Sequence, residues 1–178
     1  NYPNDYEVKF NLAQILIWQN NLCEAVEIAN NLAQSLPEKI EYLLLAAKIN
    51  FWLEKDFTYT QSLYERVLII DPKNTEAKFG LANLYIRDKN FSGAEKLIRE
   101  VSTIDSTSND FNMLKNNFSS AKNQKRINEL NLVLDEARIY SARKDYYYSI
   151  KSFNKYLVSD PNNKSVKLEL ADVYLASS

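Results

Sequence analysis

Apolar and polar residues recur in a fixed order around five alanines of the chain. An apolar residue stands three positions before each alanine, and a polar residue directly follows it. The alanines are Ala13, Ala47, Ala82, Ala137 and Ala171. The preceding apolar residues are Phe10, Leu44, Phe79, Leu134 and Leu168, and the following polar residues are Gln14, Lys48, Asn83, Arg138 and Asp172. Such an order predicts equivalent helices of an internal repeat.

The prolines give the length of this repeat. Pro3, Pro37, Pro72 and Pro161 each precede one of these alanines by ten residues, and the first three prolines are 34 and 35 residues apart. Ser106 lies where the next proline would stand. A second apolar stretch follows in each unit and ends before the next proline, which cannot continue a helix. Each unit of about 34 residues is therefore predicted to be a helical hairpin.

These residues resemble the tetratricopeptide repeat family. Residues 75–106 match best, with Leu81, Ala82, Tyr85, Phe91 and Ala94 at the family's positions. The resemblance implies an all-α fold, a right-handed α-solenoid in which alanines allow close helix contacts and aromatic residues fill the spaces between helices. It also implies that the first helix of each unit lines a concave face.

The repeat register predicts the domain organisation. Residues 1–5 are the tail of a preceding repeat, and full repeats occupy residues 6–39, 40–74 with a one-residue insertion, 75–106 and 130–163. Residues 164–178 are the first helix of a further repeat, so we expect the chain to be part of a longer repeat protein.

The register breaks at residues 107–129. Phe111, Leu114, Phe118 and Ala121 form one apolar helical stripe there, which predicts an irregular extra helix near residues 108–121. The next repeat would then begin with a helix lengthened from Lys122. Either the segment changes the direction of the solenoid or presents a partner surface, or it is a repeat that diverged without a role.

Composition argues against other folds and against catalysis. Two glycines and four prolines are too few for β-sandwiches or nucleotide-binding folds, and a net charge of -1 gives no general attraction for nucleic acid. The chain has no histidine and one cysteine, which excludes the common catalytic triads and zinc sites. No phosphate-binding loop and no membrane-spanning apolar run occurs. We expect neither an enzyme nor a cofactor.

Binding residues are expected on the first helix of each repeat. The positions that face the concave side combine apolar and polar side chains, which suits a protein or peptide ligand. The candidates are Gln14, Ile17, Trp18, Lys48, Phe51, Trp52, Asn83, Arg87 and Arg138. Some apolar members could instead pack between neighbouring helices.

Two tryptophans stand at equivalent positions of adjacent repeats. Trp18 and Trp52 each follow their alanine by five residues, and Arg87 holds this position in the third repeat. Stacked indoles and a guanidinium would form a ladder of side chains that are frequent in binding hot spots. Alternatively, each tryptophan closes the end of its own hairpin.

A second resemblance concerns the cellular compartment in which the protein acts. LAQILIWQNNLCEA, residues 12–25, looks like the first repeats of bacterial YaiO-like and exopolysaccharide-export proteins, which carry periplasmic tetratricopeptide repeats before an outer-membrane β-barrel. It implies a periplasmic scaffold, or an element that binds the polysaccharide through its tryptophans. The remaining alternative is a cytoplasmic adaptor whose Lys48, Arg87 and Arg138 clamp an acidic peptide.

Overall fold

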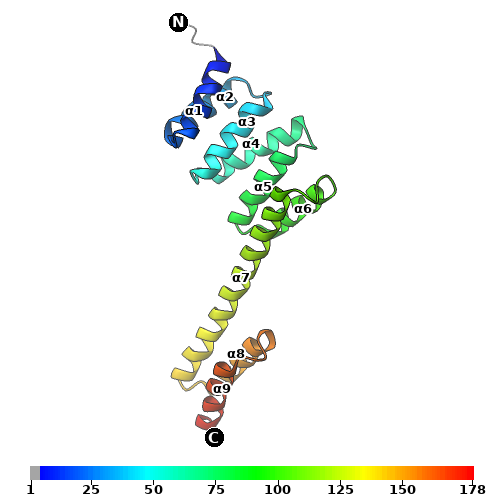
Figure 1. The fold of residues 1–178 in the computed structure, drawn as a ribbon. Helices are drawn as coiled ribbons and strands as arrows, with labels where there is room; N and C mark the ends of the chain where they lie inside the picture. Colours follow the sequence, from blue (N-terminus) through cyan, green and yellow to red (C-terminus); the bar gives the residue numbers. More distant parts are fainter. Residues whose placement is uncertain (1–4) are drawn as a thin grey trace. The chain divides into compact units, whose positions relative to one another are not determined.

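A computed structural model describes residues 5–178 of the chain, and all regular structure in this part is helical. The helices are α1 (Tyr6–Trp18), α2 (Leu22–Ser35), α3 (Ile40–Trp52), α4 (Phe57–Ile70), α5 (Thr75–Arg87), α6 (Phe91–Ser102), α7 (Asn109–Ala142), α8 (Tyr146–Ser159) and α9 (Lys164–Ala176) (Figure 1). The prediction of an all-α fold is confirmed. Pro3 and most of the predicted tail at residues 1–5 lie outside the described residues.

The same turn ends the first helix of each hairpin. Asn20, Glu54, Lys89 and Lys144 follow α1, α3, α5 and α7, and each has a positive φ between 50° and 63°. The amide of the next residue then donates to a carbonyl five residues earlier, as from Lys55 to Asn50 at 3.0 Å. This left-handed end lets the chain reverse within three residues. The same turn follows α7, so α7 and α8 also form a hairpin.

Alanines mark the closest helix contacts. Ala13, Ala47, Ala82 and Ala137 are fully buried, and so are the alanines that face them from second helices, such as Ala25 and Ala94. Because alanine has only a methyl group, the helices can approach until ridges enter grooves. Ala171 on α9 is exposed, since none of the described helices packs against that side of α9.

The chain divides into two compact units, and the division falls within α7. The first unit ends at Ala121 and the second runs from Lys122 to Ser178. The expected stripe of Phe111, Leu114, Phe118 and Ala121 packs into the first unit, where the Phe118 ring lies edge-on to Phe91 at 5.9 Å.

The segment near residues 108–121 is helical as expected, but it is not a separate helix. It forms the beginning of α7, which continues without interruption to Ala142. No proline or glycine occurs between Asn109 and Ala142 to end the helix, so the lengthened first helix of the next repeat joins the extra helix directly.

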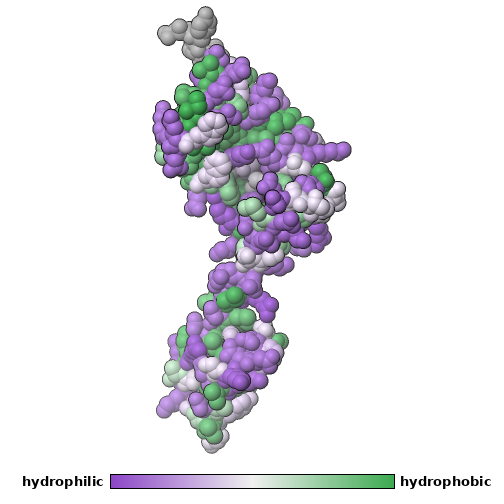
Figure 2. All heavy atoms as spheres, in the orientation of Figure 1, coloured by the Kyte–Doolittle hydropathy of each residue, from purple (hydrophilic) through white to green (hydrophobic). Residues whose placement is uncertain are grey.

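The second unit has a core of its own. Leu134 and Ala137 of α7 pack with Phe153 of α8 and with Leu170 of α9. The Ser149 hydroxyl donates to the Ala137 carbonyl at 2.9 Å, which ties α8 to α7. On the visible face, hydrophobic residues are interspersed among hydrophilic ones in both units (Figure 2).

The turn after α3 predicts a stabilising substitution. Glu54 has φ 50°, a conformation that costs a residue with a Cβ atom about 1 kcal/mol and costs glycine almost nothing. Glu54→Gly should therefore raise the Tm by about 2–4 °C in thermal unfolding followed by circular dichroism. Glu54→Ala is the control and should bring no gain, because alanine suffers the same strain. An equal rise for both variants would contradict this reading.

Candidate binding groove

A groove of about 520 Å³ lies on the first unit. Its walls come from two neighbouring first helices, α3 and α5, and its remaining residues from α4 and from the first turn of α7. The lining residues are Lys48, Phe51, Trp52, Tyr64, Thr75, Glu76, Phe79, Gly80, Asn83 and Asp110. The groove thus combines aromatic surface with amide, hydroxyl and charged groups.

The predicted cations of this region already have partners. Lys48 forms an ion pair with Glu76, which links α3 to α5. The Arg87 guanidinium lies over the Phe51 ring, 4.3 Å from its centroid, and donates to the Phe51 carbonyl oxygen at 2.6 Å. That carbonyl is in the last turn of α3, where the helix dipole favours a cation. Arg87 therefore holds the end of α3 and does not line the groove.

Tyr64 reaches the groove from the second helix α4. Its side chain is 2% exposed, and its hydroxyl forms no hydrogen bond with any of residues 5–178. Burial raises the pKa of this hydroxyl, and the Glu76 carboxylate raises the pKa further, against a smaller opposite effect of Arg87. The phenol therefore keeps its proton at neutral pH. Unlike the Tyr59 hydroxyl, which is fully buried without a partner, the Tyr64 hydroxyl is reached by solvent from the groove.

Gly80 of α5 makes room for the Tyr64 ring. A Cβ atom at position 80 would lie 2.3 Å from Cε1 and Cζ of Tyr64 and 2.6 Å from its hydroxyl oxygen. Glycine inside a helix costs about 1 kcal/mol relative to alanine, and its usual reason is the close approach of another group. Here the tip of a buried phenol is that group.

The two tryptophans differ in their surroundings. Trp52 is 51% exposed and lines the groove, whereas Trp18 is 86% exposed and does not line it. An indole that closed the end of its hairpin would be mostly buried, so the exposure of Trp18 argues against that alternative. With Arg87 held on Phe51, the expected ladder of Trp18, Trp52 and Arg87 does not form a continuous row in the groove.

The other candidates on α1 are also outside the groove. Gln14 is exposed, and Ile17 is half-buried and packs against the core of the first unit. Of the candidates on α3 and α5, Lys48, Phe51, Trp52 and Asn83 line the groove. The Asn83 amide nitrogen donates to the Phe79 carbonyl at 3.0 Å, which orients the side chain along α5.

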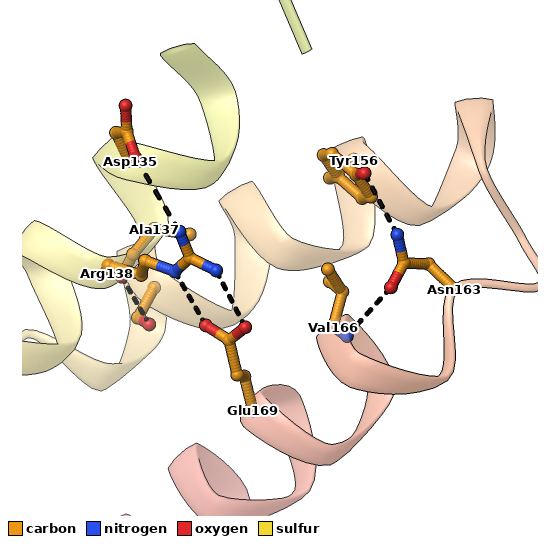
Figure 3. A network of polar contacts seen from close by, with 8 residues as sticks. Asp135, Ala137, Arg138, Tyr156, Asn163, Val166 and Glu169 are labelled. Carbon is orange, nitrogen blue, oxygen red and sulfur yellow. Dashed lines mark hydrogen bonds and ion pairs between the residues drawn. The ribbon is translucent and has the colours of Figure 1, made fainter. Parts of the chain in front are cut away.

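Arg138 belongs to the second unit and has a different environment. It forms two hydrogen bonds of 2.8 Å with the Glu169 carboxylate, and Asp135 lies 3.7 Å away (Figure 3). These hydrogen bonds lower the pKa of Glu169 and raise the pKa of Arg138. The pair borders a cavity of about 430 Å³ between α7 and α9. Arg138 is therefore engaged within its own unit.

Sequence reasoning missed several groove residues. Tyr64 was not a candidate because only first helices were expected to line the concave face. Thr75 and Glu76 were not candidates because they stand before the positions that were counted from Ala82. The signal that could have found the site is Gly80, one of two glycines in the chain, in the middle of a predicted helix. Asp110 could not be placed, since the irregular segment has no repeat register.

The described part of the chain lacks two classes of feature. No group of three or more histidine, cysteine, aspartate or glutamate residues within residues 5–178 is arranged to hold a metal ion. None of the helices in this part of the chain combines the length and the apolarity needed to cross a membrane.

Comparison with known proteins finds a family match over part of the chain. Residues 51–117 match the tetratricopeptide repeat family, and this stretch includes most of the groove. A segment of 91 residues is 30% identical to human Protein O-mannosyl-transferase TMTC3, and the match covers 51% of this chain and 10% of that protein. The chain therefore corresponds to a small part of this relative.

Solved structures agree with the fold. A tetratricopeptide repeat protein from Parabacteroides merdae has a TM-score of 0.58 at 20% identity, over 97% of this chain and 59% of that one. A thermophilic protein of the same repeat class from Thermus thermophilus has a TM-score of 0.59 at 11% identity, over 96% and 99% of the two chains. At these identities the likeness concerns the fold alone, and the predicted solenoid of helical hairpins is confirmed.

The contact between Gly80 and Tyr64 predicts an unusual response to alanine. Gly80→Ala should lower the Tm, because overpacking against a buried ring costs about 1–3 kcal/mol and exceeds the gain of about 1 kcal/mol in helix propensity. In a Tyr64→Leu background, the shorter side chain leaves space, and the same substitution should raise the Tm. Thermal unfolding of the four proteins measures this coupling. A rise in both backgrounds would show that the ring does not constrain position 80.

Proposed function

We propose that this chain, which carries tetratricopeptide repeats, is a non-catalytic scaffold that binds an extended segment of another protein in the groove of its first unit. The observation that carries the proposal is Trp52, whose indole is half exposed on the wall of a groove that also contains Phe51 and Phe79. Exposed aromatic surface inside a concavity is typical of protein-binding hot spots.

The polar groups of the groove support a peptide ligand. Asn83 and Thr75 are half-buried beside the aromatic residues, so a bound chain could bury apolar side chains and hydrogen-bond through its backbone. Lys48 and Glu76 join α3 to α5 across the groove, and the Arg87 contact fixes the end of α3. The site is therefore held in place before a ligand arrives, which reduces the entropy lost on binding.

An adaptor that clamps an acidic tail is less compatible with these contacts. Lys48 is paired with Glu76, Arg87 with the Phe51 carbonyl, and Arg138 with Glu169 in the other unit. A ligand carboxylate would have to displace each of these partners and would approach the carboxylates of Glu76 and Asp110.

The periplasmic setting and a role in polysaccharide export are a separate proposal. They are supported by the resemblance of residues 12–25 to repeats of exopolysaccharide-export proteins. The exposed indoles of Trp18 and Trp52 are the side chains that would stack on sugar rings. Direct polysaccharide binding is therefore the second candidate function.

The matched pair of tryptophans tests the first proposal. Peptides selected from a phage-displayed random dodecapeptide library on the purified chain should bind Trp52→Ala at least about tenfold more weakly, as expected for a hot-spot residue. Trp18→Ala removes an even more exposed indole outside the groove and should leave Kd unchanged in fluorescence anisotropy. Equal losses in both variants, or none in Trp52→Ala, would contradict binding in the groove.

Oligosaccharides test the second candidate. Under direct polysaccharide binding, the intrinsic tryptophan fluorescence should shift when bacterial exopolysaccharide fragments are added, and the shift should shrink in both Trp18→Ala and Trp52→Ala. The expected outcome of the protein-binding proposal is an unchanged spectrum across the sugars, together with a shift on addition of the selected peptides.

A further inference from the structure

We propose that the groove selects a basic peptide segment, whose main-chain carbonyl accepts a hydrogen bond from the Tyr64 hydroxyl and whose lysine or arginine side chain lies against Asp110. The inference rests on the proposed function and specifies the chemistry of its ligand.

Tyr64 supplies a fixed hydrogen-bond donor. Its ring is almost completely buried and lies against Gly80, so the hydroxyl cannot turn away from the groove that it lines. No described residue accepts its proton. A peptide carbonyl is the most abundant acceptor that an extended ligand can offer, and a bound strand would satisfy the hydroxyl without moving the protein.

The charge of the lining residues favours a cation in the ligand. The groove is lined by one lysine and two carboxylates, and Lys48 is already paired with Glu76. Asp110 is exposed and has neither an ion pair nor a hydrogen bond with any of residues 5–178. It lies in the first turn of α7, where the helix dipole stabilises a negative charge. The uncompensated charge of the groove is therefore negative.

The aromatic residues of the groove also favour a cationic ligand side chain. Half of the Trp52 side chain is exposed on the wall opposite α5, together with the half-buried Phe51. Indole is the aromatic side chain that attracts cations most strongly, and the apolar stem of lysine or arginine can pack along it. An acidic segment would find neither an uncommitted cation nor a favourable aromatic face.

The test uses two matched pairs of substitutions on the complete chain and the peptides selected above. Tyr64→Phe removes the hydroxyl in the groove, and Tyr59→Phe removes a fully buried hydroxyl of α4 that has no partner and does not line the groove. Asp110→Asn removes the charge in the groove, and Asp88→Asn removes an exposed aspartate outside it. Each protein is measured with the selected peptide and with a version whose basic residues are replaced by glutamine.

The expected pattern has four parts. The selected peptides are enriched in lysine and arginine, and Tyr64→Phe weakens their binding about 3- to 10-fold, the range of one neutral hydrogen bond. Asp110→Asn weakens it about 3- to 5-fold, with no further loss for the glutamine peptide, as expected of an exposed ion pair. Both Tyr→Phe variants keep or raise the Tm, which separates lost binding from lost folding.

The inference would be overturned, with groove binding intact, if the selected peptides were acidic and bound Asp110→Asn more tightly than the original chain. It would also be overturned if peptides that depend on Trp52 bound Tyr64→Phe as tightly as the original chain. An equal loss in Tyr59→Phe would also overturn it. If no selected peptide depends on Trp52, the proposed function fails together with the inference.

Discussion

The structure depends on how closely its helices approach one another. The alanines of the first helices have no exposed surface where they meet the second helices, and a larger side chain at these points would separate the helices. Because the contact recurs about every 34 residues, each hairpin places its first helix beside that of its neighbour, as α3 lies beside α5. The groove between these helices follows from the packing of the alanines.

Much of the fold could be predicted from the sequence, because its pattern is local. The alanine and proline spacing indicated the hairpins, and each of the four left-handed residues follows the alanine of its first helix by seven residues, without any glycine. The continuity of α7 could not be predicted, since the register was lost at Ser106 and nothing in the pattern distinguishes two helices from one. Helix continuity there depends on the absence of a terminating residue rather than on a positive signal.

The binding site was less predictable than the fold, because contacts between repeats decide which side chains are available. Lys48, Phe51, Trp52 and Asn83 were expected at the groove and line it. Arg87 was expected beside them, but it extends to the preceding repeat and caps α3. The repeat register predicts the side of the helix on which a residue lies. It does not predict where a long side chain ends, and the Arg87 side chain binds a backbone carbonyl 36 residues earlier in the chain.

Tyr64 and Gly80 show how a site can be recognised by its cost. A glycine inside α5 weakens the helix by about 1 kcal/mol relative to alanine, so Gly80 lowers stability on its own. Together, Tyr64 and Gly80 place a protonated phenol at the groove, which is also lined by Asp110, a carboxylate without an ion pair among the described residues. Alanine at position 80 would favour the helix but would collide with the Tyr64 ring. A glycine that is unfavourable for its helix and that leaves space for a phenol at the groove is most simply explained by a ligand that uses this phenol.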